Sequence, residues 1–205
     1  MSRQRSRLIL ASQSPRRREL LKQAKYDFAV LPAREEAEDA ARPGESPRDY
    51  VARLARQKAA DVAAQLADAT AAGSIDDLTS RIIVACDTIV LLGDSLLGKP
   101  ADAARARQML SSLSGREHAV LSGLCLWPLD GAPAKTEIAE SRLRMDRLSA
   151  AQIDEYVASG LWAGKAGGFG YQDRLGWLHV VAGSESNIVG LPLELLAEML
   201  AAMKA

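Results

Sequence analysis

Short apolar runs alternate along this chain with longer segments in which apolar residues recur at helical spacing. The apolar runs predict seven strands: Leu8–Ala11, Tyr26–Leu31, Arg81–Leu92, Ser95–Leu97, Glu117–Trp127, Thr136–Met145 and Trp177–Val181. The helical spacing predicts five helices: Arg16–Ala24, Ser46–Asp68, Asp102–Leu113, Ser149–Gly160 and a last helix entered through Pro192. Because strands and helices are mixed from one end to the other, the pattern predicts an α/β protein with a mixed sheet.

Turn and cap residues sharpen this picture. Ser149 and Gln152 have the spacing of a capping box, and Gly93-Asp94 lies between two apolar runs, which predicts a hairpin. The small, polar segment Ala69–Ser80 has no periodicity and predicts a surface loop. The chain has no internal repeat, so we expect a single domain over residues 1–205, with its chemistry in a cleft.

Composition excludes several classes of partner. The chain has 205 residues, with 26 basic and 26 acidic side chains, so it lacks the positive field that gathers nucleic acid or anionic lipid. Its apolar runs are far shorter than the roughly 20 residues of a membrane span. We therefore expect no nucleic-acid and no membrane partner. Cys86 and Cys125 lie in apolar runs, and no other Cys or His lies nearby at the spacing of metal ligands. This pattern predicts reduced, buried thiols and a cytoplasmic location.

Asp87 is the most unusual residue of the predicted strands, because it interrupts the apolar run Ile82–Val90. Burying an unpaired carboxylate is expensive. The residue therefore predicts a partner, which can be a metal ion, a lysine or hydrogen-bond donors at a strand end. The alternative is a bend in an edge strand that exposes Asp87 to solvent. Lys99 follows the predicted hairpin, which would fold it back toward Asp87, so the two resemble a catalytic pair.

Basic residues gather at the start of the first helix, where Arg16, Arg17 and Arg18 follow Ser14-Pro15. Cations there oppose the helix dipole by roughly 0.3 to 1 kcal/mol each, which is understandable if an anion such as a phosphate chain binds at that end. A solvated basic turn explains the same residues equally well. Lys58, on the long helix, would either reach a phosphate or extend its ammonium to water.

Two further segments contain candidate ligands. Gly164–Gln172 has four glycines that permit close backbone approach to a flat ligand, and Gln172 has the donor and acceptor needed to read a base edge. A turn-rich loop without a ligand is the alternative. Glu35-Glu36 lies in an acidic connection and would supply a second carboxylate for Mg²⁺, although such residues are usually only solvated.

Six ordered motifs together resemble the Maf family of nucleotide pyrophosphatases, and they span nearly the whole chain. They are Leu8–Leu21, Arg53–Ala59, Asp87–Val90, Gly98–Pro100, Lys165–Gln172 and Asn187–Leu193. The resemblance implies an inosine-triphosphatase-like fold, with a mixed elongated sheet, flanking helices and two lobes around a cleft. It also implies a cytosolic homodimer that hydrolyses nucleoside triphosphates to the monophosphate and pyrophosphate, using Mg²⁺ or Mn²⁺.

The resemblance also implies roles for particular residues. Asp87 would be the general base on the attacking water and would join Glu36 around the metal. The groups that grip the triphosphate would be Ser12, Arg16, Arg17, Lys58 and Lys99. A non-hydrolytic nucleotide-binding regulator of cell division is the alternative function.

Three positions separate branches of this family. Arg16, Thr88 and Gln172 match the branch similar to dTTP/UTP pyrophosphatases, whereas the branch acting on 7-methyl-GTP has an aromatic residue, Gln and Glu there. The pyrimidine branch is therefore favoured over a 7-methyl-GTP pyrophosphatase. The chain departs from the family pattern at several positions, among them Phe169 for the usual Tyr and Asp173 for Gly, which bears on base selectivity more than on hydrolysis.

Overall fold

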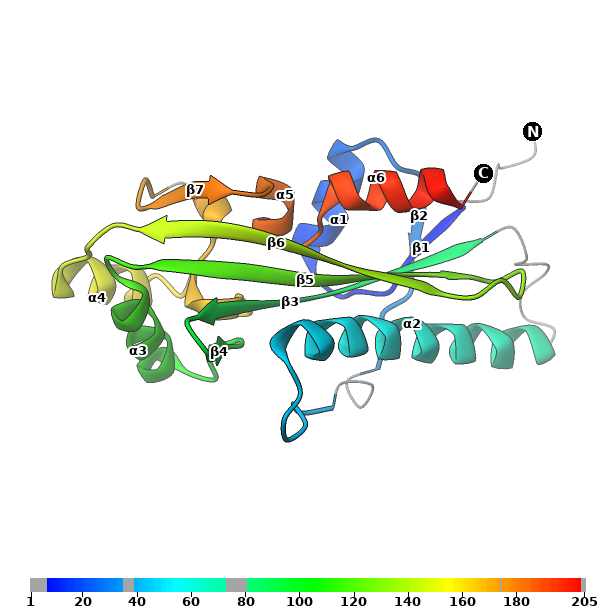
Figure 1. Ribbon diagram of the computed structural model, residues 1–205, viewed down its shortest axis with the longest axis horizontal. Helices are drawn as coiled ribbons and strands as arrows, with labels where there is room; N and C mark the ends of the chain where they lie inside the picture. Colours follow the sequence, from blue (N-terminus) through cyan, green and yellow to red (C-terminus); the bar gives the residue numbers. More distant parts are fainter. Residues whose placement is uncertain (1–6, 35–38, 73–80, 174, 204–205) are drawn as a thin grey trace. The chain divides into compact units, whose positions relative to one another are not determined.

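The fold is a mixed α/β arrangement built on one sheet. A computed structural model describes residues 7–34, 39–72, 81–173 and 175–203 of the chain. The seven predicted strands are all present: β1 (Leu8–Leu10), β2 (Phe28–Val30), β3 (Ile82–Leu92), β4 (Ser95–Leu97), β5 (Glu117–Pro128), β6 (Lys135–Met145) and β7 (Leu178–Ala182). The prediction of a mixed sheet with flanking helices is confirmed (Figure 1).

The five predicted helices are present, with one addition. The described helices are α1 (Pro15–Gln23), α2 (Pro47–Ala71), α3 (Ala103–Leu113), α4 (Ala150–Ala158), α5 (Glu185–Val189) and α6 (Leu193–Ala202). The predicted loop Ala69–Ser80 was wrong at its start, because α2 continues to Ala71; residues 73–80 of it lie outside the described residues. Within the described part of the chain, the helices are too short or too polar to cross a membrane.

The strand order is β2-β1-β3-β5-β6-β7, with β4 paired to β3. β1 runs parallel to β2 and to β3, and Leu10 lies opposite Val84. Antiparallel pairing of β3 with β4 sets Val90 opposite Leu97 and confirms the predicted hairpin. The N–H of Ala11 still donates to the oxygen of Val84, at 2.9 Å, so the chain leaves β1 for α1 beside the part of β3 that leads to Asp87.

The chain divides into two compact units. Unit 1 consists of Met1–Asp87, Gly123–Ile138 and Leu193–Ala205, and unit 2 consists of Thr88–Ser122 and Ala139–Pro192. β3 passes from unit 1 to unit 2 between Asp87 and Thr88. The boundary between the units in β3 thus falls between two candidate site residues, Asp87 and Thr88.

Unit 1 has its own apolar core between α2 and the sheet. α2 covers one face of the unit 1 strands, whereas α1 and α6 lie on the other (Figure 1). The core residues are Ile9, Ala11, Ala55, Ala59, Val62, Leu66, Ile83, Ala85 and Cys125. Two of the four α2 residues in this core are alanines, whose small side chains let the helix approach the sheet closely.

The backbone of α2 lies directly against the sheet at Gly123 in β5. A Cβ atom added there would overlap the backbone oxygen of Val51 and would lie 2.8 Å from the backbone nitrogen of Ala52. Only glycine fits, because its missing side chain leaves room for the helix backbone. This contact holds α2, and with it Lys58 two turns further on, at a defined distance from the sheet.

Unit 2 has a second core, formed by α3, α4 and the unit 2 parts of the strands. Its buried residues include Val90, Leu97, Leu110, Leu143, Met145, Tyr156 and Phe169. α3 and α4 pack side by side, and an ion pair joins Arg107 to Asp154 on their surface. The predicted capping box at the start of α4 is confirmed, with the Ser149 and Gln152 side chains each bonded to the other's backbone.

Candidate functional site

The centre of the candidate site is a buried ion pair between Lys58 and Asp87. Lys58 Nζ donates to Asp87 Oδ1 at 2.5 Å, and the two residues are only 6% and 8% exposed. Lys58 is brought there by α2, whose buried face continues on either side of it with Ala55 and Ala59. The predicted partner of Asp87 is thus a lysine, and the alternative of a solvent-exposed bend is wrong.

The structure gives this role to Lys58, on α2. Snorkelling of Lys58 to water, the alternative raised from the sequence, is also wrong, because its ammonium is buried against the carboxylate. Lys99 follows β4 and is exposed. Its pairing with Asp87 and its catalytic role stay predictions.

One oxygen of Asp87 remains available for chemistry. Lys58 occupies Oδ1, whereas Oδ2 makes no hydrogen bond to another described residue. A carboxylate held at one oxygen by a lysine has a fixed orientation, and its other oxygen can accept a proton or bind a cation. The arrangement suits a general base whose direction is set by Lys58.

The described residues do not form a complete metal cage. No group of three or more His, Cys, Asp or Glu side chains in the described ranges is placed to hold a metal ion. Glu36, the predicted second ligand, lies outside the described residues. Mg²⁺ is nevertheless commonly held by one or two carboxylates, with substrate phosphates and waters completing the shell. Asp87 Oδ2 fits that donor chemistry.

A second set of polar groups lies where β1 leads into α1. Ser12 is 7% exposed, and its Oγ accepts hydrogen bonds from the Ser14 N–H and from Arg17 Nη1, both at 3.2 Å. These two bonds use the acceptor lone pairs of Ser12, so its O–H remains to donate. Ser14 precedes α1 without capping it by its side chain, and the first turn contains no acidic residue. With Arg16 partly buried beside them, these groups suit an anion.

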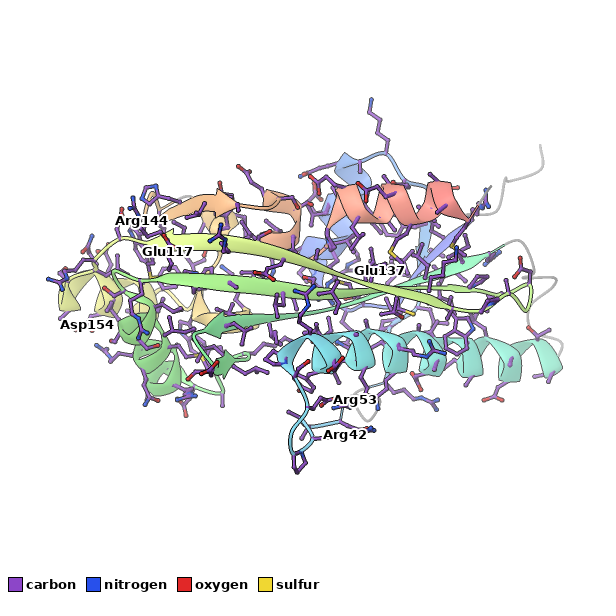
Figure 2. The ribbon with its side chains drawn as sticks, in the orientation of Figure 1. Arg42, Arg53, Glu117, Glu137, Arg144 and Asp154 are labelled. Carbon is purple, nitrogen blue, oxygen red and sulfur yellow. The ribbon has the colours of Figure 1, made fainter. Side chains whose placement is uncertain are left out.

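The acidic connection before α2 is tied to that helix by arginine and glutamine side chains. Arg53 makes a bidentate ion pair with Glu45, with Nε–Oε1 at 2.6 Å and Nη2–Oε2 at 2.7 Å. Its Nη2 also donates to the backbone oxygen of Ala40 at 3.0 Å. Arg53 lies near the start of α2, and the connection that precedes it carries Arg42 (Figure 2). Gln57 donates to Asp39 at 2.6 Å.

A second set of hydrogen bonds ties the start of the connection to α2. Arg34 donates to Asp61 through its backbone N–H at 2.9 Å and through Nε at 2.7 Å, and Gln65 adds a bond to Asp61 at 2.8 Å. Burial opposes ionisation of Asp61, but the bonds from Arg34 outweigh it and lower the pKa of the carboxyl. The chain on both sides of residues 35–38 is therefore anchored to the helix that carries Lys58.

The Glu45–Arg53 ion pair predicts a pH-dependent contribution to stability. The hydrogen bond from Arg53 lowers the pKa of Glu45 from 4.5 to about 2. A depressed carboxyl pKa stabilises the folded state above the ordinary value, and this stabilisation is lost as the pH falls from 4.5 toward 2. In urea unfolding, Glu45→Gln should be less stable than the parent at pH 6, and the difference should shrink at pH 3. Glu155→Gln, an exposed change on α4, should show no such trend; an equal deficit at both pH values would contradict the assignment.

Unit 2 brings together two of the sequence motifs. The N–H of Gly167 donates to the oxygen of Gly98 at 2.9 Å, which joins the glycine-rich segment to the residue before Lys99. Thr88 Oγ1 lies 2.9 Å from Ser122 Oγ and 3.4 Å from the oxygen of Gly190. Gln172 is exposed. Thr88 is thus held within its own unit, whereas the Gln172 side chain faces solvent.

Two buried polar clusters in unit 2 were not predicted. Asn187 Nδ2 donates to the oxygen of Val120 at 3.2 Å and to Ser141 Oγ at 3.0 Å, which anchors α5 to the sheet. Lys165 forms a buried ion pair with Asp173. The position of Asn187 inside a motif was a signal for the first cluster. Lys165 opens the motif Lys165–Gln172, but no sequence pattern pointed to Asp173 as its partner.

The two histidines have structural surroundings, and the cysteines are buried, as predicted. His118 is buried against the Phe169 ring, with centroids 5.2 Å apart, and burial lowers its pKa. His179 is exposed and lies 3.0 Å from Asp146. Cys86 and Cys125 are both free and buried.

Curated proteins similar to this chain share one activity name. This chain is 44% identical over 194 residues to the dTTP/UTP pyrophosphatase of Rhodopirellula baltica. The alignment covers 94% of this chain and 80% of that protein. The chain is 44% identical to the Sphingopyxis alaskensis protein of the same name, covering 91% and 90%, and 44% identical to that of Ralstonia nicotianae, covering 95% and 92%.

Comparison with solved structures and with protein families gives two further findings. Among solved structures, that of the Staphylococcus aureus Ham1 protein matches with a TM-score of 0.37 and 14% identity over 67% of this chain and 71% of that one. The family model described as "Maf-like protein" matches residues 7–203. A match over nearly the whole chain, together with relatives at this level of identity, shows that the chain belongs to the Maf family.

Proposed function

We propose that this protein hydrolyses dTTP and UTP to the corresponding monophosphate and pyrophosphate. The observation that carries the proposal is the buried Lys58–Asp87 pair, which holds a carboxylate with one oxygen unoccupied by any described residue. The names of the similar proteins, dTTP/UTP pyrophosphatases, support the same reaction. The inosine-triphosphatase-like fold, the cleft and the single-domain organisation remain expectations from the family resemblance.

Asp87 acts as the general base in this proposal. Its Oδ2 takes a proton from water, and the water oxygen attacks the α-phosphorus. The bond from that phosphorus to the oxygen bridging toward the β-phosphate then breaks, and pyrophosphate leaves with the electron pair. No covalent intermediate is needed. Lys58 keeps Oδ1 occupied, so the same carboxylate oxygen faces the water in every turnover.

The triphosphate is bound by cations and hydroxyl groups. Ser12, Arg16 and Arg17 at the start of α1, together with Lys58 and Lys99, are the proposed ligands of its oxygens, because negative charge develops on the leaving pyrophosphate. A Mg²⁺ or Mn²⁺ ion, when bound, would neutralise part of that charge as a Lewis acid. Asp87 would hold it, with Glu36 as the second carboxylate.

Base selection is assigned to the residues that match the pyrimidine branch, Arg16, Thr88 and Gln172. A glutamine amide can donate to O4 and accept from N3–H of uracil or thymine. The proposed biological setting is a cytoplasmic homodimer that removes non-standard nucleotides, an extension of the family resemblance.

The proposed function is tested with a nucleotide panel and coupled pyrophosphate detection. We expect release of pyrophosphate from dTTP and UTP with Mg²⁺ or Mn²⁺, at a kcat/KM at least about tenfold above that for GTP and 7-methyl-GTP, since the base contacts discriminate among bound nucleotides. The monophosphate should appear in equal amount. Tight dTTP binding without product would favour the non-hydrolytic regulator, and preference for 7-methyl-GTP would contradict the pyrimidine assignment.

A further inference from the structure

The glycine-rich segment of unit 2 is closed by an ion pair that the proposed chemistry does not use. Lys165 Nζ lies 2.6 Å from Asp173 Oδ1 and 2.5 Å from Oδ2, so it contacts both oxygens of the carboxylate. Tyr156, on α4, donates its hydroxyl to Asp173 Oδ2 at 2.7 Å. Both charged side chains are 8% exposed. We call Tyr156, Lys165 and Asp173 the clamp.

The clamp fixes the backbone between its two charged members. A Cβ added at Gly170 would lie 2.5 Å from Lys165 Nζ and 2.6 Å from Asp173 Oδ2, so the ion pair packs directly on the glycine backbone. The N–H of Asp173 also donates to the oxygen of Gly170 at 3.1 Å, within the turn Tyr171–Asp173. The loop is therefore folded onto the ion pair, and glycine is required where the two touch.

The contact of Lys165 with both oxygens of Asp173 argues against a direct role on phosphate. Its ammonium has a bidentate carboxylate partner and little access to solvent, so its charge is already compensated inside the unit. Two of its three N–H donors already meet the Asp173 carboxylate, which leaves little capacity for a phosphate oxygen. The consequence is that Lys165 acts through the loop and not on the nucleotide.

Gln172 is the residue that the clamp positions. It directly precedes Asp173, about 3.8 Å away between Cα atoms, in the same short turn. Its side chain is exposed and makes no hydrogen bond to another residue of the described ranges. A flexible exposed side chain selects a ligand only if its backbone is held in place, because ordering it on binding costs affinity.

We propose that the clamp of Tyr156, Lys165 and Asp173 is a specificity-determining device, which holds Gln172 in position to bind the pyrimidine base. The inference rests on the proposed function and adds three positioning residues to it. In this proposal the clamp acts on binding of the base and not on the phosphates.

The test compares Asp173→Asn and Tyr156→Phe with the parent, using the full chain. We expect the KM for dTTP to rise about tenfold in Asp173→Asn and about threefold in Tyr156→Phe, with kcat changed less than about threefold, because ground-state binding of the base is weakened. The preference for UTP over CTP should fall in parallel. Asp154→Asn, the same chemical change on the surface of α4, is the matched control and should leave KM unchanged.

Inorganic tripolyphosphate, which has no base, distinguishes positioning from phosphate binding. Its inhibition constant should be the same in the parent and in both clamp variants. Equal weakening of tripolyphosphate and dTTP, or an unchanged KM in both variants, would overturn the proposal. Thermal unfolding identifies loss of folded protein, which lowers apparent kcat without raising KM; Tyr156→Phe loses one hydrogen bond and keeps the test decisive if Asp173→Asn folds poorly.

Failure of the proposed function has a different signature from failure of the clamp. If the parent itself released no pyrophosphate, the proposed hydrolysis would be wrong. The clamp would then be judged by calorimetric binding of dTTP and of tripolyphosphate to the same variants, where a selective loss of dTTP affinity supports it and equal losses contradict it.

Discussion

Asp87→Asn is expected to reduce the kcat for pyrophosphate release from dTTP by about a thousandfold or more, in line with the loss of a general base that also meets the metal. The asparagine amide still has an oxygen to accept the bond from Lys58, so the pair's geometry is largely kept while the proton acceptor is lost. The measurement is steady-state pyrophosphate release, with far-UV circular dichroism to verify folding.

The matched control is Asp94→Asn, an exposed aspartate in the turn of the β3–β4 hairpin. It makes the same chemical change seven residues further along and should retain the parent's kcat. Binding of dTTP by Asp87→Asn, measured by calorimetry, should persist, because the phosphate-binding cations are intact. A variant at Asp87 that hydrolyses as fast as the parent would remove this residue from the mechanism.

Gly123→Ala is expected to be the most disruptive single methyl addition in unit 1. The new Cβ would overlap the oxygen of Val51, and neither a helix backbone nor the centre of a strand can move aside without repacking its neighbours. We expect a loss of about 2 to 3 kcal/mol in the free energy of unfolding, which lowers Tm by roughly 5 to 10 °C. Because α2 carries Lys58, kcat should fall as well.

Differential scanning calorimetry measures this effect, with Gly98→Ala as the comparison. A Cβ at Gly98 meets nothing within 4 Å, and its backbone is not in the left-handed region, so its unfolding free energy should change by about 0.5 kcal/mol or less. Equal Tm values for Gly123→Ala and the parent would mean that α2 does not approach β5 as closely as described.

The strands and most helices could be predicted because their signals are local. The unbroken apolar run of β3, the turn Gly93-Asp94 and the cap residues of α4 each act within a few positions. α5 was missed because its five residues are too few to show a periodicity. The end of α2 was misplaced because the loop interpretation overlooked Ala69 and Ala71, which are good helix formers.

The candidate site could be predicted only in part. A buried carboxylate implies a partner, so the sequence pointed to a partner for Asp87, but the choice among metal, lysine and donors depends on which face of α2 meets β3. Lys58 lies 29 residues away, and no local rule fixes that rotation. The Lys165–Asp173 pair was missed for a related reason. Asp173 was recognised only as a departure from the family pattern, and its contact depends on the path of the chain through glycines with positive φ.

The two buried ion pairs also constrain how this sequence can change. Replacing Lys58 alone strands the charge of Asp87 in apolar surroundings, and replacing Asp87 with an apolar residue strands the ammonium; the same holds for Lys165 and Asp173. The two residues of each pair are therefore expected to change together. A substitution of one residue is tolerated only if it is conservative or if a second substitution removes the charge left on its partner. Libraries that randomise one residue of a pair and keep the other fixed are expected to yield mostly misfolded or inactive variants. Libraries that randomise both residues together are expected to contain more folded, active variants.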